Sequence, residues 1–203
     1  PNAPEGYMYR AQQETVAGDF SSAERDMEQA LKFANPKDDV YFNYARMIYN
    51  KEIFQSAQPY AGWSLEKALQ QIQAANAINP QPAYRQLEAN IRFAMKQYQE
   101  AYDIYQELLA TNLRSAEVFF AAARCKEMQK DSTAMLALMD STISMFTRPY
   151  LKEVAPYLWA RAEARRNAGL YRDAVSDMNE YETLMTATVN DNFYYIRHQV
   201  EIQ

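Results

Sequence analysis

Residues 158–181 read LWARAEARRNAGLYRDAVSDMNEY, with apolar and small side chains on either side of Gly169. These side chains recur at the i, i+3, i+4, i+7 spacing that is typical of one face of a helix. The residues that share the two inner faces are Leu158, Ala162, Arg165, Ala174, Met178 and Tyr181. Glycine adopts the backbone angles of a tight turn without steric cost. The stretch therefore predicts two helices joined at Gly169, with Ala162 and Ala174 at their closest approach.

The same pattern occurs near the start of the chain, in residues 7–36. When Gly18 is superposed on Gly169, several other positions coincide. The coinciding pairs are Arg10 with Arg161, Ala11 with Ala162, Ala23 with Ala174, Asp26 with Asp177 and Met27 with Met178. Pro36 is expected to close the second helix of this copy, as proline does just beyond a helix C-terminus. We interpret the chain as an array of related helix pairs.

Alanines mark further copies between these two: Ala45 with Ala68, Ala89 with Ala101, and Ala122 with Ala134. We expect one array over residues 1–203, with copies at 4–37, 38–81, 82–114, 115–147 and 155–188 and a final helix at 192–203. Sustained period-2 alternation, which would indicate strands, does not occur. The predicted fold class is therefore all-α.

The second copy contains an insert at residues 52–62. Its aromatic residues Phe54 and Tyr60, and Trp63 just after it, would favour aggregation if they were exposed in a loop. We expect all three to be largely buried against the second and third copies. If they are exposed, the insert is better interpreted as an element that binds a partner.

The repeat length, the small residue in each first helix, the turns at Gly18 and Gly169 and the closing Asn-Pro at Asn79 resemble the tetratricopeptide repeat (TPR). The third and fourth copies are degenerate, since they lack the turn glycine. The resemblance implies a right-handed superhelical solenoid of five antiparallel helix pairs plus a final helix. It also implies that the first helices line a concave groove that holds a peptide or a helix of another protein.

Composition excludes several classes of function. The net charge of −5 argues against nucleic acid, whose binding needs a dense basic surface. No apolar run is long enough to span a bilayer. The chain has four glycines, and they are too scattered for a phosphate-binding loop. His198 is the only histidine, and with Cys125 it does not make a zinc site. We expect no cofactor, no metal and no catalytic activity, and a buried Cys125.

A second stripe on each first helix, one place from the core face, is expected to line the groove. The stripe mixes aromatic and polar side chains, which is common at protein interfaces. It begins with Met8, Gln12 and Thr15, and the expected partner-binding residues are Phe42, Arg46, Tyr49, Gln86, Asn90, Phe93, Phe119, Lys126, Trp159, Glu163, Arg166 and Tyr195. The alternative for any one of them is packing inside the core. We expect Trp159 to be the main anchor, because it combines a large apolar surface with Glu163 and Arg166 nearby.

The expected function is a non-enzymatic protein-interaction scaffold. The Lys and Asn pattern of TPR domains that clamp a carboxylate of chaperones does not occur: the matching places hold Met8, Gln12, Phe42 and Arg46. The alternative function is a structural spacer or assembly segment of a larger multidomain protein of the bacterial envelope. The acidic, Tyr- and Gln-rich composition and the start at Pro1 favour an exported, periplasmic location over a cytoplasmic one. Self-association through the open terminal helix is a further possibility.

Overall fold

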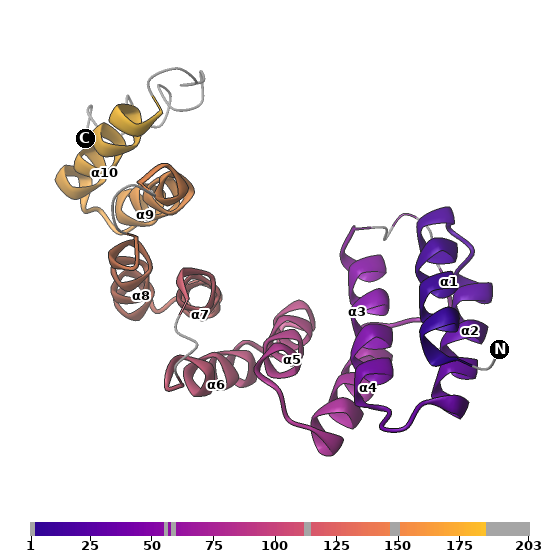
Figure 1. Cartoon of the computed structure of the whole chain (residues 1–203). Coiled ribbons are helices and arrows are strands. Elements are labelled where there is room, and N and C mark those ends of the chain that lie inside the picture. The colour runs from indigo at the N-terminus through magenta and orange to yellow at the C-terminus, as the bar shows by residue number, and fades with distance from the viewer. Residues whose placement is uncertain (1–2, 55–56, 58–59, 112–114, 147–150, 186–203) are drawn as a thin grey trace. The chain divides into compact units, whose positions relative to one another are not determined.

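The computed structural model describes residues 3–54, 57, 60–111, 115–146 and 151–185, and these residues form helices joined by short turns (Figure 1). The expected final helix at 192–203 lies outside the described residues. The helices are α1 (Pro4–Ala17), α2 (Phe20–Phe33), α3 (Asp38–Phe54), α4 (Leu65–Ile78), α5 (Pro82–Ala94), α6 (Tyr98–Leu109), α7 (Ala116–Met128), α8 (Ser132–Ser144), η1 (Leu151–Val154, a 3-10 helix), α9 (Ala155–Asn167) and α10 (Tyr171–Leu184).

Successive helices pack as pairs: α1 with α2, α3 with α4, α7 with α8 and α9 with α10. Helices α5 and α6 make the remaining pair, with the rings of Phe93 and Tyr98 5.4 Å apart at their turn. No residue in the described ranges is in a β-strand. The all-α prediction is confirmed, and the architecture is that of a TPR-like α-α solenoid.

Small residues sit where the two helices of a pair approach most closely. Ala11 and Ala23 in the first pair, and Ala162 and Ala174 in the last, are all 0% exposed. A larger side chain there would push the helices apart, at a cost of about 1–3 kcal/mol. The sequence prediction for these alanines is confirmed.

The turns between paired helices use a left-handed backbone. Gly18 (φ 81°) and Gly169 (φ 77°) supply it in the first and last pairs. Lys96 (φ 63°) and Lys130 (φ 61°) occupy the same place in the pairs that lack a glycine. The position of Lys130 corrects the alignment of the fourth copy by one residue.

In the fourth copy, the residue that corresponds to Ala11 is Ala123, and the residue that corresponds to Ala23 is Met135. Both are buried, whereas Ala134 is only half-buried. Met139 then falls on the position of Met27 and is likewise buried. The alignment through Ala122 and Ala134 was therefore wrong by one place.

Several helices begin at a polar residue whose side chain accepts a hydrogen bond from the first turn. Asp19 accepts from the backbone N–H of Ser22 at 3.0 Å, and Asp131 accepts from that of Ala134 at 3.1 Å. Ser64 and Ser115 do the same for α4 and α7. Such N-caps satisfy backbone donors that have no partner within the helix, so they fix where each helix starts.

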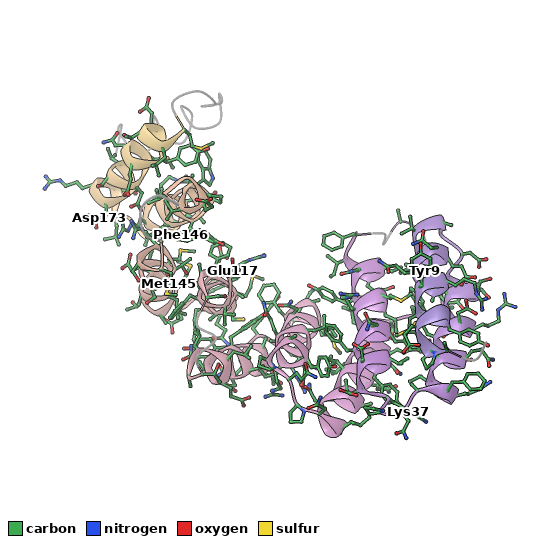
Figure 2. The ribbon with its side chains drawn as sticks, in the orientation of Figure 1. Tyr9, Lys37, Glu117, Met145, Phe146 and Asp173 are labelled. Carbon is green, nitrogen blue, oxygen red and sulfur yellow. The ribbon has the colours of Figure 1, made fainter. Side chains whose placement is uncertain are left out.

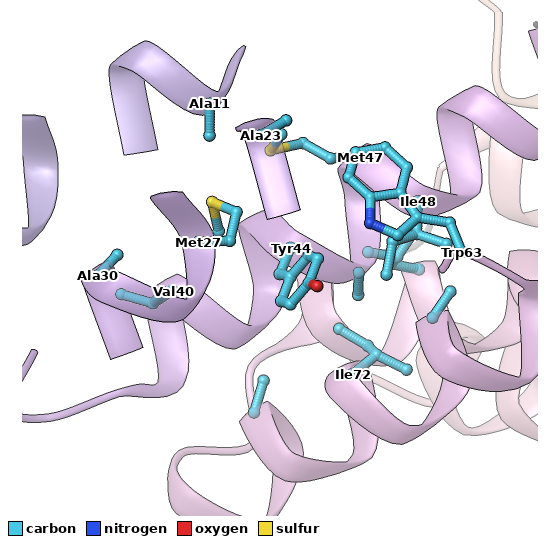
Figure 3. Packing of buried hydrophobic residues seen from close by; sticks show 14 of the residues in the cluster. Ala11, Ala23, Met27, Ala30, Val40, Tyr44, Met47, Ile48, Trp63 and Ile72 are labelled. Carbon is cyan, nitrogen blue, oxygen red and sulfur yellow. The ribbon is translucent and has the colours of Figure 1, made fainter. Parts of the chain in front are cut away.

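The chain divides into two compact units, Pro1–Ile104 and Tyr105–Gln203, and the boundary falls within α6. In the first unit, α1 to α5 enclose a continuous apolar core (Figure 3). Met27, Tyr44, Ile48 and Ile72 contribute its large side chains, each at most 2% exposed. In the second unit, Met178 and Ala162 form the corresponding core of the last pair.

Tyr60 and Trp63, which precede α4, pack against the first pair. Trp63 is 3% exposed, and its ring centroid lies 5.5 Å from that of Phe20 on α2. Tyr60 is half-buried and also faces the Phe20 ring, whereas Phe54 is 77% exposed at the end of α3. The burial prediction is confirmed for Trp63, holds in part for Tyr60 and is wrong for Phe54. Tyr60 and Trp63 pack against Phe20 on α2, so their packing surface includes the first copy as well as the predicted second and third copies.

The carboxylate of Glu24 on α2 holds this segment in place. It accepts hydrogen bonds from the hydroxyl of Tyr60 at 2.5 Å, from the hydroxyl of Tyr44 at 3.2 Å and from Nζ of Lys67 on α4. Burial alone raises the pKa of Glu24, but these three donors together outweigh it and hold the pKa below its usual range. One carboxylate thus joins α2, α3, α4 and the residues before α4.

An arginine–aspartate pair recurs in the first and last helix pairs. Arg161 on α9 donates to both carboxylate oxygens of Asp177 on α10, at 3.0 and 2.5 Å. Arg10 makes the same two-pronged contact with Asp26. The pairs differ in burial, since the Arg161 side chain is 12% exposed and that of Arg10 is 58% exposed. The repeat alignment through Gly18 and Gly169 is therefore reproduced in atomic contacts.

We expect Asp177→Asn to lower the free energy of unfolding by up to about 3–5 kcal/mol, because it leaves the largely buried Arg161 and Arg165 to share the exposed carboxylate of Asp140. Asp26→Asn is the matched control, and its loss should be smaller, on the order of 1 kcal/mol, because Arg10 can be hydrated. Urea denaturation followed by circular dichroism measures both. Equal losses would contradict this account of burial.

We expect Glu24→Gln to reduce stability at neutral pH by about 1.5–3 kcal/mol, since it removes the charged acceptor of three donors. The folded-state pKa of Glu24 lies below the unfolded value, so its contribution is present above the unfolded pKa and is lost as pH falls through the folded one. The difference between wild type and variant should therefore shrink below about pH 4. Melting curves over this pH range test it; a difference independent of pH would exclude an ionised Glu24.

Candidate functional site

A groove lies between α1 and α3, the first helices of the first two pairs. Its volume is about 580 Å³, within the range of roughly 300–1,000 Å³ that is common for ligand sites. Its lining residues are Met8, Tyr9, Gln12, Thr15, Val16, Asn43, Arg46, Met47 and Asn50. We call it the first groove.

The lining of the first groove combines amide and hydroxyl groups with apolar side chains and one charge. Among the described residues that line it, Arg46 is the only charged one, in a chain of net charge −5. Its guanidinium donates to the side-chain oxygen of Asn43 at 2.8 Å and lies 5.5 Å from the ring centroid of Phe42. Tyr9 and Val16 on α1 are 68% and 76% exposed, and Figure 2 labels Tyr9. The arrangement offers a positive centre with apolar surface on the neighbouring helix.

A second, smaller groove of about 200 Å³ lies between α7 and α9. It is lined by Phe120, Arg124, Glu127, Met139, Ala160, Glu163, Ala164 and Asn167. Its charged groups have both signs, in contrast to the first groove. The two grooves therefore differ in the charge of their lining.

The two grooves are built from the same repeat positions, counted from the small residue of each first helix. The earlier helix contributes the places three before, one after and four after it: Met8, Gln12 and Thr15 on α1, and Phe120, Arg124 and Glu127 on α7. The later helix contributes the places two before and one, two and five after it: Asn43, Arg46, Met47 and Asn50 on α3, and Ala160, Glu163, Ala164 and Asn167 on α9. A groove thus uses two adjacent stripes, one from each helix.

The structure brings together some of the residues that the sequence pattern proposed. Met8, Gln12, Thr15 and Arg46 meet in the first groove, and Glu163 lies in the second. Sequence reasoning missed the second stripe on the later helix, which adds Asn43, Met47 and Asn50. The sequence could have predicted this stripe, because Asn43, Met47 and Asn50 each follow a residue of the proposed stripe and have the same helical spacing.

Other proposed residues lie elsewhere in the two units. Phe42 stacks on Tyr84 at 4.7 Å, Tyr49 packs on the first core, and Phe119 is 7% exposed. Gln86, Asn90 and Phe93 are half-buried on α5, and Lys126 donates to the side chain of Gln129 at 3.0 Å. Phe120 takes the groove position expected for Phe119, as the one-residue shift of the fourth copy requires.

The proposed anchor Trp159 lies against α10. It is half-buried, packs on the cluster of Ala162 and Met178, and its ring centroid is 5.4 Å from that of Tyr181. Arg166, which is half-buried, lies 4.0 Å from Glu163. Tyr195 lies outside the described residues. The anchor role of Trp159 stays a prediction.

Exposed apolar side chains gather at the end of α3. Phe54 is 77% exposed and Ile53 is 41% exposed. With Asn43, Met47 and Asn50, Phe54 follows one face of α3 at helical spacing, so it continues the stripe that lines the first groove. The long α3 includes the start of the insert, and its exposed Phe54 ring lies beyond the residues that line the groove.

No group of three or more metal-ligating side chains occurs among the described residues. None of the helices described there is both long and apolar enough to cross a membrane. Cys125 is fully buried, as predicted, and burial raises its pKa to about 11, so its reactive thiolate form is rare at neutral pH. His198 lies outside the described residues.

The fold is that of TPR proteins. The chain is similar in structure to the C-terminal part of a TPR repeat-containing protein from Cytophaga hutchinsonii, with a TM-score of 0.75, 14% identity and coverage of 96% of this chain and 73% of that one. It is similar to PilW, a type IV pilus biogenesis factor, with a TM-score of 0.71, 13% identity and coverage of 98% and 84%. It is also similar to YrrB, a TPR protein with an unusual peptide-binding site, with a TM-score of 0.66, 11% identity and coverage of 97% and 91%. No protein-family model matches the sequence, and no curated protein matches it.

We expect Phe54→Ser to change the free energy of unfolding by less than about 0.5 kcal/mol, because the ring is exposed. Trp63→Ala, at the other end of the same segment, should cost about 3–5 kcal/mol, because it empties a buried site. Urea denaturation of both variants makes the comparison. A large loss for Phe54→Ser would show that this ring is part of the core.

Proposed function

We propose that this protein is a non-enzymatic interaction scaffold whose first groove binds a segment of another protein. The observation that carries the proposal is the lining of this groove: one arginine, several amide groups and exposed apolar side chains, with no carboxylate among its lining residues. YrrB, which shares the fold, is described as having a peptide-binding site, and this supports a similar role here.

The lining suggests the chemistry of the bound segment. An extended segment has unpaired backbone N–H and C=O groups, and the amides of Gln12 and Asn50 can both donate to them and accept from them. An acidic side chain of the segment would pair with Arg46. Apolar side chains of the segment would contact Val16 and, beyond the groove, Phe54. The proposed ligand is therefore an extended peptide with an acidic residue beside apolar ones.

The proposal also retains the aromatic stripe at the other end of the chain. Trp159 occupies on α9 the repeat position of Met8 on α1 and of Phe120 on α7, and both of these line a groove. Trp159 would thus serve a groove on the far side of α9. Trp159→Ala separates the two possible roles, since an anchor loses affinity by about 2 kcal/mol or more, whereas a core residue loses stability.

The test is selection from a random peptide library on the full chain, followed by affinity measurement of the selected peptides. We expect acidic and apolar residues to be enriched. Val16→Glu should weaken binding by at least about tenfold, because it places a carboxylate beside Arg46 and opposes an acidic ligand. Val16 is 76% exposed, so this change should leave the fold intact.

Gln13→Glu is the matched control, because it adds the same charge to α1 at an exposed position outside the groove lining. It should bind the selected peptides like wild type. Basic peptides, or equal weakening by the two variants, would contradict the proposal. Binding that survives Val16→Glu would move the site away from the first groove.

A further inference from the structure

In three first helices, α3, α5 and α9, the residue just before the small alanine hydrogen-bonds to the helix pair before it. The hydroxyl of Tyr44 donates to Glu24 on α2 at 3.2 Å. The amide of Asn76 on α4 donates to Glu88 at 2.9 Å. These are two of the described junctions, and in both the first-helix residue is nearly fully buried, at 2% and 4% exposed.

The junction between α8 and α9 follows the same rule with a charged pair. Nη1 of Arg161 donates to the carboxylate of Asp140 on α8 at 2.7 Å, in addition to its contact with Asp177. Arg165, one turn further on, also contacts both carboxylates. Covered in this way, the Arg161 side chain is only 12% exposed.

Arg10 holds this position in the first pair, and no helix of the described chain covers it. It makes the pair's internal contact with Asp26, yet its side chain is 58% exposed. Beside it the rings of Tyr7 and Phe33 stack at 5.9 Å, and Phe33 is 42% exposed. Leu158, which corresponds to Tyr7 in the last pair, is by contrast 0% exposed.

A polar group on this surface also lacks a partner. Oε2 of Glu14 is out of contact with solvent and has no hydrogen-bond partner among the described residues. Burial, and then the nearby charge of Asp26, raise the pKa of Glu14. A hollow of about 310 Å³, lined by Ala3, Gly6, Tyr7 and Arg10, lies on the same surface. We call the surface formed by Tyr7, Arg10, Glu14 and Phe33 the outer face of the first pair.

We propose that the outer face of the first pair docks an amphipathic helix of another protein, which presents a carboxylate to Arg10 as Asp140 does to Arg161. The helix places apolar side chains over Tyr7 and Phe33. The α8–α9 junction shows this carboxylate–arginine contact, and the α2–α3 and α4–α5 junctions have a hydrogen bond at the same repeat position. The charge of Arg10 selects an acidic contact. This site is separate from the first groove.

A probe is available within the chain itself. A labelled peptide of residues 131–146 contains the N-cap Asp131 and α8, the helix whose Asp140 contacts Arg161. Titrated with the full chain and followed by fluorescence anisotropy, it should show saturable binding. The same peptide with Asp140→Asn should bind at least about fivefold more weakly, because it loses a charge-assisted contact. With the Arg10→Gln chain, the two peptides should bind equally, as a double-mutant cycle requires.

A blocking variant keeps the test independent of the Arg10–Asp26 pair. A Cβ added at Gly6 meets no atom within 4 Å, so Gly6→Glu is compatible with the fold and places a carboxylate in the hollow. It should abolish binding of the peptide. Two control variants of the full chain, Ala137→Glu at an exposed position of α8 and Val16→Glu in the first groove, should still bind the peptide.

Three results would overturn the proposal. The first is absence of saturable binding, and the second is equal binding of the two peptides to the wild-type chain. The third is a dimer in analytical ultracentrifugation that Gly6→Glu dissociates, because the outer face would then be occupied by a second copy.

Discussion

The close approach of two helices at a pair of small residues is the constraint on which the other contacts depend. With Ala11 against Ala23, and Ala162 against Ala174, the helices of a pair lie near enough for Arg10 and Arg161 to reach across to an aspartate. The same approach brings Met27 and Met178 into the core of their pairs. A single helix pair cannot bury its apolar faces alone, so each pair relies on its neighbours for a complete core.

Charge distinguishes the surfaces that this common scaffold presents. The first groove has one guanidinium and no carboxylate among its lining residues, whereas the second has Arg124 beside Glu127 and Glu163. The repeat geometry is shared, so the difference comes from side chains alone. The two grooves thus differ in charge on the same arrangement of helices.

The sequence predicted the helix pairs, the turn glycines and the alanine contacts, because these depend on local spacing. It placed the fourth copy one residue out of register because Ala121, Ala122 and Ala123 are all small, so that spacing alone does not identify the contact residue. The turn at Lys130 is what fixes the register. The groove was predicted in part, since its second stripe depends on how neighbouring first helices are rotated, and tertiary packing sets that rotation. Phe54 and Trp63 look alike in the sequence, and only the path of the chain after α3 separates an exposed ring from a buried one.

The two lysines in left-handed turns have a consequence for how far the protein is from its stability optimum. A side chain at such backbone angles costs about 1–2 kcal/mol relative to the right-handed region, and glycine avoids this cost. The turns at Gly18 and Gly169 avoid this strain, whereas the turns at Lys96 and Lys130 contain it. Two positions in the middle of the chain, Lys96 and Lys130, are therefore less stable than they would be with glycine. Natural proteins commonly retain positions of this kind, because selection requires only enough stability for function.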